Sequence, residues 1–146
     1  LFQERLSADA TKDKAFDKLY EELRQYKDDF LFQAEKPLLL DLLLFYDSLN
    51  WFQESLIKQE MSPDVIADSY QYLIDEFLEI LYRRDVIPMD ETDTFDVKLH
   101  KAVKVVEAED ESEDYKVKQV LKRGFTRADR ALRAEEVVIA RAKGKK

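Results

Sequence analysis

Three stretches of this sequence carry residue types that could do chemistry. His100, the only histidine, lies in FDVKLHKAV, and a side chain of this type could serve as a general acid or base. The acidic run EAEDESED, residues 107–114, could hold a cation. The stretch VLKRGFTRADRALRAEEVVIARA, residues 120–142, gathers Arg and Lys around Gly124 and could bind phosphate. Each stretch must be tested against its surroundings.

None of the three completes an enzyme site or a metal site. No Ser, His and Asp context suggests a nucleophile, and two glycines leave no room for a Gly-rich phosphate loop. Cysteine is absent, and EAEDESED lacks the glycine and the distal Glu of a calcium loop. We expect a structural hydrogen-bonding His100, a solvated acidic loop, and no enzyme activity, catalytic residue, metal or cofactor.

The charge of the chain changes sign along its length. The net charge is −8, but residues 1–96 hold 23 acids and 10 bases, whereas residues 97–146 hold 9 acids and 14 bases. Two units with different surfaces are indicated. Within residues 115–146 the bases exceed the acids by 8, yet Tyr115 and Phe125 are the sole aromatic platforms and the rest of the chain repels phosphate. We therefore expect no nucleic-acid partner.

Membrane insertion is not expected either. The longest apolar run, PLLLDLLLFY, is far shorter than the roughly 20 residues that span a bilayer. With no signal peptide and no cysteine, a cytoplasmic location is the expectation. The chain starts at Leu1 rather than Met, as a processed or trimmed fragment would.

A long paired helix is predicted over residues 1–36, with Ser7 or Thr11 as its N-cap. Its apolar residues follow the 3-4 spacing of a coiled-coil seam. Pro37 predicts a break or kink near Glu35 and Lys36. The seam consists of Phe16, Leu19, Leu23, Tyr26 and Phe30.

A helical hairpin is predicted over residues 37–86. Nine of the twelve residues 38–49 are apolar, so this helix needs cover on more than one side. Ser62 as N-cap and Pro63 at the first helical position begin the next helix, which ends near Arg83 and Arg84. Two broad-faced helices cannot cover each other fully, so we predict a homodimer with a four-helix bundle.

The apolar period changes to two beyond Val86. DVIPMDETDTFD reads as a connector, and KAVKVVE, YKVKQVLKRGF, ALRA and EVVIARA read as strands of a small half-buried sheet over residues 87–146, with a basic tail. The acidic run 107–114 joins the first two strands. Gly124 is expected either to take a positive φ or to form a bulge that re-aims Phe125.

Four segments resemble those of one known family. FDVKLHKAV resembles FDPNLHEAV, VLKRGFTRADRALRAEEVVIA resembles VLQKGYTLNGRVLRPAMVKVA, LLLFYDSLNWF resembles LLPVLDNLERAL, and FLEILYRRDVIPM resembles the segment between bundle and sheet. Together they are similar to GrpE, the nucleotide exchange factor of DnaK-type chaperones. The resemblance implies an α+β fold: a long N-terminal helix, a helical hairpin that dimerises into a four-helix bundle, and a small C-terminal all-β wing.

The resemblance also implies that the wing binds the ATPase domain of the chaperone and promotes ADP release by favouring its open state. A dimeric helical adaptor without exchange activity is the alternative. The chain departs from the family pattern at Asp85, where the family has Gly, and at Leu44, Val97, Glu135 and Glu136. The implied partner-binding residues are Leu121, Arg130 and Ile139, with Lys122, Arg123, Arg133 and Asp85 beside them. The expected dimer interface comprises Phe16, Leu19, Leu23, Leu42, Phe45, Leu49, Phe52, Ile66, Tyr70, Leu73 and Phe77.

Overall fold

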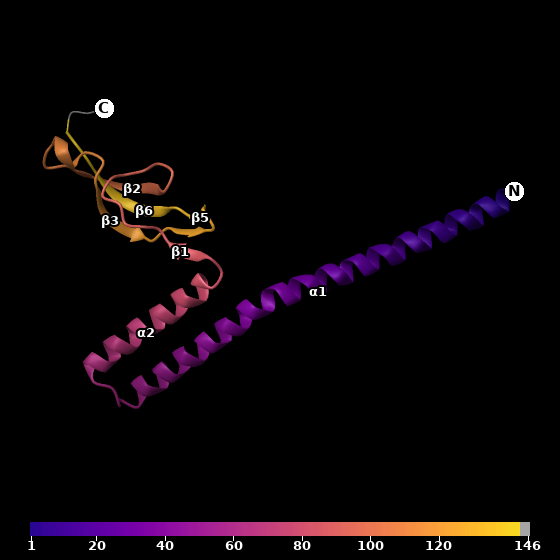
Figure 1. Ribbon diagram of the computed structural model, residues 1–146, viewed down its shortest axis with the longest axis horizontal. Coiled ribbons are helices and arrows are strands. Elements are labelled where there is room, and N and C mark those ends of the chain that lie inside the picture. Colours follow the sequence, from indigo (N-terminus) through magenta and orange to yellow (C-terminus); the bar gives the residue numbers. More distant parts are fainter. Residues whose placement is uncertain (144–146) are drawn as a thin grey trace. The chain divides into compact units, whose positions relative to one another are not determined.

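A computed structural model describes residues 1–143 of the 146-residue chain, and the end of the expected basic tail, residues 144–146, lies outside that range. Two long helices come first and six short strands follow, so the predicted α+β class is confirmed (Figure 1). By contacts within the chain there are two units, residues 1–60 and the chain from Met61 onward. They are described in turn.

The first unit is one helix, α1, which spans Phe2–Ile57 without interruption. The predicted N-caps are wrong, because Ser7 and Thr11 both lie inside the helix. The Thr11 hydroxyl donates to the backbone carbonyl of Ser7, one turn earlier, at 2.9 Å. The helix therefore begins earlier than the capping pattern indicates.

The predicted break at Pro37 is also wrong, because α1 continues through it, while the alternative of a kink stays a prediction. A proline in a helix interior removes one backbone hydrogen bond and costs about 3 kcal/mol. The flanking residues Ala34, Glu35, Lys36 and Leu38–Leu40 are strong helix formers, and they keep the helical conformation on both sides. The expected boundary between residues 36 and 37 is thus not a boundary between elements.

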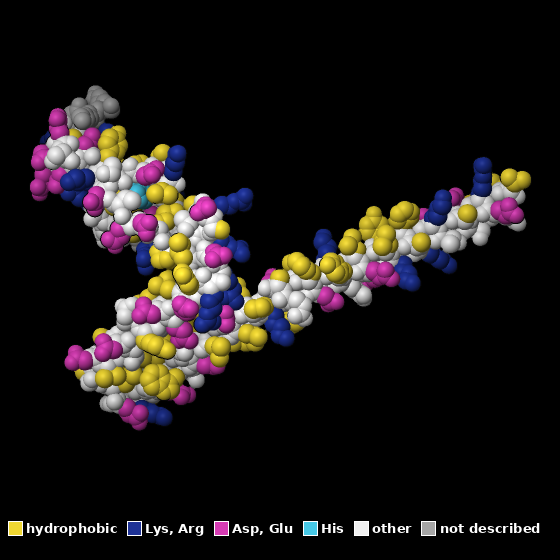
Figure 2. All heavy atoms as spheres, viewed as in Figure 1, with side chains coloured by type: hydrophobic (Ala, Val, Ile, Leu, Met, Phe, Trp, Pro, Cys, Tyr) yellow, Lys and Arg dark blue, Asp and Glu magenta, His cyan; other side chains and the backbone are white. Residues whose placement is uncertain are grey.

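None of the 56 residues of α1 is buried. The five seam side chains remain 52–68 % exposed, and Tyr26 and Phe30 stack on each other with ring centroids 6.4 Å apart. Figure 2 shows yellow apolar side chains along the part of α1 that runs toward the N-terminus. In residues 1–143, neither helix combines the length and the apolar character that a membrane span requires.

The second unit begins with helix α2, Pro63–Tyr82, and its predicted ends are confirmed. The Ser62 side chain accepts a hydrogen bond from the Val65 N–H at 3.3 Å, and Pro63 occupies the first turn. Arg83 is the C-cap. Leu73 and Ile80 are the buried residues of α2.

A short strand, β1, replaces part of the expected irregular connector. It spans Val86–Pro88 and follows Asp85, which has a φ of 60°. A positive φ after a helix is the left-handed position that favours glycine, as the family pattern implies for this site. Strand β1 pairs antiparallel with β4, Phe125–Arg127, so the helix leads directly into a sheet.

The six strands form two three-stranded sheets. One has the order β1-β4-β5, with β5 at Arg130–Arg133. The other has the order β2-β6-β3, with β2 at His100–Glu107, β3 at Val117–Lys122 and β6 at Glu135–Arg141. Strand β6 is central and runs parallel to β2 and antiparallel to β3. A 3-10 turn, η1 at Glu111–Glu113, lies in the acidic run between β2 and β3.

Strand β6 forms the core of the sheet domain. Val137, Val138, Ile139 and Ala140 are each at most 5 % exposed, so both faces of this strand are covered. The expected alternation on β2 is interrupted, because the pairing register shifts between Ala102 and Lys104. The expected segments overlap strands β2 to β6, but the half-buried pattern expected for the sheet does not describe β6, most of which is buried.

Gly124 does not take the positive φ that was one of the two conformations expected for it. Its φ lies outside the positive range, and the register shift near Phe125 belongs to the β4–β5 pair. A Cβ on Gly124 would lie 2.4 Å from the Met89 sulfur and 2.8 Å from the Glu135 nitrogen. Glycine is thus required by close packing, where β3 turns into β4.

Candidate functional site

Arg130 lies at the tip of a two-residue β-hairpin. Strands β4 and β5 pair Arg127 with Arg130, and Ala128 and Asp129 between them have φ values of 44° and 64°. Two positive φ values are the signature of a type I′ turn, which is normally built from Asn and Gly. The tight turn exposes Arg130 at one end of the β1-β4-β5 sheet.

Leu121 and its neighbours lie on the edge strand β3. Leu121 is 48 % exposed, so its apolar side chain is accessible for a contact with another protein. The Lys122 ammonium is 3.6 Å from a Glu136 carboxylate oxygen, and its side chain is 65 % exposed. The expected contact residues Leu121 and Lys122 are therefore accessible in the single chain.

Arg133 is held in place by the turn that it adjoins. Its Nε and Nη2 donate to the Arg123 carbonyl at 3.0 and 2.8 Å, and its guanidinium lies 5.5 Å from the centroid of the Phe125 ring. A forked hydrogen bond together with a cation–π contact fixes the side chain. Arg133 therefore braces the turn at Arg123 and is still exposed at its surface.

Ile139 differs from the other expected contact residues. It is 5 % exposed and lies in the middle of β6, so its side chain is unavailable to a partner in this conformation. The central position of β6 explains the difference, since a strand covered on both faces reads as a continuous apolar run. Leu73, expected at the dimer interface, is likewise buried, at 6 % exposure.

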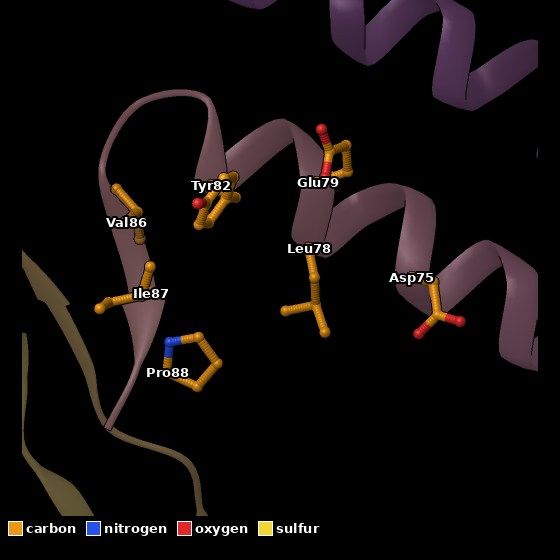
Figure 3. Close-up of a pocket in the computed structure, with 7 residues that line it drawn as sticks. All are labelled: Asp75, Leu78, Glu79, Tyr82, Val86, Ile87 and Pro88. Atoms are coloured by element: carbon orange, nitrogen blue, oxygen red, sulfur yellow. The ribbon is translucent and has the colours of Figure 1, made fainter. Parts of the chain in front are cut away.

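A shallow hollow of about 240 Å³ lies between the last turns of α2 and strand β1. Figure 3 shows Leu78 and Tyr82 of the helix beside Ile87 and Pro88 of the strand, with the carboxylates of the hollow, Asp75 and Glu79, on the helix. A wider hollow beside it includes Asp85 and the Ala128–Asp129 turn. The Asp85 carbonyl accepts a long hydrogen bond of 3.4 Å from the Ala128 N–H.

His100 has the structural role expected of it. Its Nδ1 accepts from the Asp96 N–H at 2.9 Å, and its Nε2 is 3.1 Å from the Thr92 hydroxyl oxygen. The ring is 5 % exposed and contacts Phe95, with centroids 5.8 Å apart. These bonds hold the loop before β2.

The carboxylates of the acidic run have structural partners. Asp110 caps η1 by accepting from the Ser112 N–H and hydroxyl, and the Ser112 side chain holds the pKa of Asp110 below its ordinary value. The Lys118 ammonium, 2.9 Å from Glu113, lowers the pKa of Glu113 in the same way. Asp114 accepts from Arg141 Nε at 3.1 Å and from the Ala142 N–H at 2.8 Å. Within residues 1–143, no group of three or more His, Asp or Glu side chains is placed to hold a metal ion.

Glu135 has a structural role that its sequence context does not predict. Its carboxylate is buried and accepts from the Gly124 N–H at 3.2 Å, while its other oxygen is 3.8 Å from His100 Nε2. Its departure from the family pattern was the available signal. The pairing with His100 depends on the parallel β2–β6 register, which sequence periodicity does not reveal.

These features define a class of protein: a long exposed helix joined to a small sheet domain whose accessible residues suit binding to another protein. The chain belongs to the GrpE family, whose sequence pattern it matches over residues 3–141. Members of this family are co-chaperones rather than enzymes, in agreement with the sequence prediction.

Individual family members are distant relatives of this chain. The chain is 28 % identical to Protein GrpE of Prochlorococcus marinus (strain MIT 9215) over 142 residues, which cover 97 % of this chain and 56 % of that protein. It is 30 % identical to Protein GrpE of Coxiella burnetii (strain RSA 493 / Nine Mile phase I) over 126 residues, covering 85 % and 61 %. It is 28 % identical to that of Helicobacter pylori (strain G27), covering 86 % and 65 %. The chain thus spans little more than half the length of the relatives it matches.

Proposed function

We propose that this protein is a nucleotide exchange factor that binds the ATPase domain of a DnaK-type chaperone and promotes release of ADP. The observation that carries the proposal is the family match over residues 3–141, which includes both helices and the whole sheet domain. The cysteine-free composition suits a reducing compartment such as the cytoplasm.

The proposed contact surface comprises exposed residues of the sheet domain. Leu121 on β3 supplies an apolar contact, and Arg130 at the hairpin tip supplies a polar one, with Lys122, Arg123 and Arg133 nearby. Asp85 lies at the entry to the domain and is a further candidate. We omit Ile139 from the proposed surface, because its side chain is buried.

The mechanism requires no bond chemistry. A protein that binds the open form of the ATPase domain more tightly than the closed, ADP-bound form shifts the population toward the open form, from which ADP escapes. By thermodynamic linkage, ADP weakens binding of the exchange factor by the same factor. A coupling of about 1–3 kcal/mol corresponds to a 5- to 150-fold change in affinity.

We also propose that two copies of the chain associate through α1. The five seam side chains, Phe16 to Phe30, are more than half exposed, and burying each fully would stabilise the assembly by roughly 1.5–3 kcal/mol. The rest of the expected interface comprises Leu42, Leu49, Tyr70 and Phe77, which are exposed, and Phe45, Phe52 and Ile66, which are half-buried. We omit Leu73 from this proposed interface, because it is buried within the single chain.

The test is the rate of fluorescent ADP release from a DnaK-type chaperone of the same organism. The wild-type chain should accelerate release, and Arg130→Ala should reduce the acceleration about tenfold, as loss of one well-placed interface residue does. Lys104→Ala, an exposed cation on β2 in the other sheet, is the matched control and should retain full acceleration.

Two results would contradict the proposal. If the chain binds the ATPase domain but leaves ADP release unchanged, the alternative of an adaptor without exchange activity holds. If it neither binds nor accelerates release, the chain lacks the function proposed here. An unchanged rate with Arg130→Ala would remove Arg130 from the contact surface and leave the exchange function intact.

A further inference from the structure

The turn at Arg123–Gly124 is one of three chain segments that link the two sheets, with residues 89–99 and Ala134. It joins β3, the edge of the β2-β6-β3 sheet, to β4, the centre of the β1-β4-β5 sheet. Leu121 lies just before this turn, and Arg130 lies one hairpin beyond it. The turn, together with the Ala134 link from β5 to β6, therefore helps to set how Leu121 and Arg130 lie relative to each other.

Both residues of the turn are held by hydrogen bonds from outside the strand ladders. The Gly124 carbonyl accepts from the Met89 N–H at 2.9 Å, and the Arg123 carbonyl accepts from the Arg133 guanidinium. The Gly124 N–H has a different kind of partner, a side-chain oxygen of Glu135 at 3.2 Å. A buried N–H without an acceptor destabilises the folded state, so this carboxylate fills a structural need.

The carboxylate of Glu135 also connects the turn to the start of β2. Glu135 is 4 % exposed, its N–H donates to the Leu99 carbonyl at 2.9 Å, and its second oxygen is 3.8 Å from His100 Nε2. Since His100 Nδ1 accepts from the Asp96 N–H, the proton of the neutral ring lies on Nε2, toward the Thr92 hydroxyl and Glu135. The ring therefore presents the positive end of an N–H dipole toward the buried carboxylate.

A buried carboxylate is expensive unless its oxygens are satisfied. At this position the family segment quoted above has a small residue, whereas this chain has Glu135. Close packing makes the arrangement rigid, because Gly124 leaves no room for a Cβ beside Met89 and the Glu135 nitrogen.

We propose that Glu135 is a positioning residue: through the Gly124 N–H it fixes the turn that orients the Leu121 strand relative to the Arg130 hairpin. The proposal deepens the proposed function, since the affinity for the ATPase domain depends on both residues meeting the partner together. The proposed role is geometric, so it can be tested in this chain alone, without the chaperone.

Three variants of the full-length chain separate the contributions. Glu135→Met keeps the side-chain length and apolar packing but removes both acceptor oxygens. Glu135→Gln retains an oxygen that can accept from the Gly124 N–H. Glu107→Met is the matched control, because Glu107 lies at the opposite, exposed end of the same parallel strand pair.

The first readout is amide hydrogen exchange, measured residue by residue by NMR. In Glu135→Met we expect the Gly124 and Met89 amides to exchange at least tenfold faster, while the Val138 amide in the centre of β6 stays within twofold of wild type. Glu135→Gln should restore Gly124 to within about threefold, and Glu107→Met should match wild type throughout. Equal acceleration at Val138 would show plain destabilisation, and no acceleration at Gly124 would show that the contact is idle; either overturns the proposal.

The second readout is affinity for the isolated, nucleotide-free ATPase domain of the chaperone. We expect Glu135→Met to bind about tenfold more weakly and Glu135→Gln to bind within threefold of wild type. A loosened turn with unchanged affinity would overturn the positioning role. If the wild-type chain itself does not bind, the proposed function fails, and the exchange pattern at Gly124 alone decides whether Glu135 orients the turn.

Discussion

The long helix α1 and the central strand β6 differ in how far their apolar residues are buried. None of the 56 residues of α1 is buried, although its seam holds five large apolar side chains. In β6, five of seven residues are buried, and the strand is covered on both faces by the sheet domain itself. The sheet domain thus completes its own core, whereas α1 leaves its apolar seam exposed, as the proposed pairing through α1 requires.

The largest effect is expected from a charge in the core of β6. Val137→Asp places a carboxylate at a position that is 0 % exposed and offers no ionic partner, which should cost more than about 4 kcal/mol. The sheet domain should unfold while α1 remains helical. NMR would then lose the dispersed amide signals of the strands, and far-UV circular dichroism would keep most of its helical signal.

The control for Val137→Asp is the same substitution at Val103. This side chain is 42 % exposed on β2, so a carboxylate there stays hydrated and should cost less than about 1 kcal/mol. If Val137→Asp abolished the helical signal as well, the helices would depend on the sheet domain, and the contrast between α1 and β6 would fail.

The next largest effect is expected on the seam of α1. The double variant Leu19→Asp with Leu23→Asp should raise the dissociation constant of the proposed dimer at least 100-fold, because each leucine is worth roughly 1.5–3 kcal/mol of burial. Amide protection in β6 should not change. Sedimentation equilibrium measures the dissociation constant directly.

Tyr20→Asp provides the matched control for the seam. Tyr20 is 68 % exposed on the same helix but lies outside the 3-4 spacing, so the dimer should tolerate the charge. A wild-type chain that sediments as a folded single copy at micromolar concentration would remove the basis for pairing through α1.

The sequence predicted the helices better than it predicted their limits. Ser62 and Pro63 begin α2 as expected, because a capping hydroxyl followed by proline has one favourable local geometry. Pro37 was misjudged, because the loss of one hydrogen bond is a local cost that a long run of helix formers on both sides can absorb. A capping hydroxyl followed directly by proline thus marks a helix start securely, whereas Ser7 and Thr11, which no proline follows, lie inside α1.

In the candidate site, too, some features follow from local sequence patterns and others do not. Exposure of Leu121 and Arg130 agrees with the resemblance to the family, since both lie on strands or turns that a period of two identifies. Burial of Ile139 and the contact between Glu135 and Gly124 depend on which strands are neighbours. A parallel pairing of β2 with β6 joins segments some 35 residues apart in number, and no local pattern encodes it.

A smaller effect is expected at the boundary between α2 and the sheet domain. Asp85 has a φ of 60°, a conformation that costs a residue with a Cβ roughly 1 kcal/mol and costs glycine little. Asp85→Gly should therefore raise the free energy of unfolding by up to about 1 kcal/mol, as a higher urea midpoint of the sheet domain. Asp90→Gly is the control, because Asp90 has no positive φ and glycine there brings only added chain entropy. A lower midpoint for Asp85→Gly would mean that the Asp85 side chain stabilises the turn by contacts that outweigh its strain.

The smallest effect is expected at the acidic run, residues 107–114. Carboxylates of this run bond to residues of the sheet domain, whereas the carboxylates of α1 mostly face solvent. The Lys118 ammonium lowers the pKa of Glu113 below its ordinary value of 4.5, so the pair stabilises the folded state at neutral pH. Because the folded pKa is the lower one, this contribution is present above pH 4.5 and is lost as the pH falls through the folded pKa. Lys118→Gln should move the pKa of Glu113 upward, toward 4.5, in a carboxyl ¹³C NMR titration. The pKa of Asp110 should stay unchanged, because the Ser112 hydroxyl lowers it most and Lys118 does not contribute to its shift. An unmoved Glu113 would indicate that the backbone N–H of Glu109, and not the lysine, stabilises the anion.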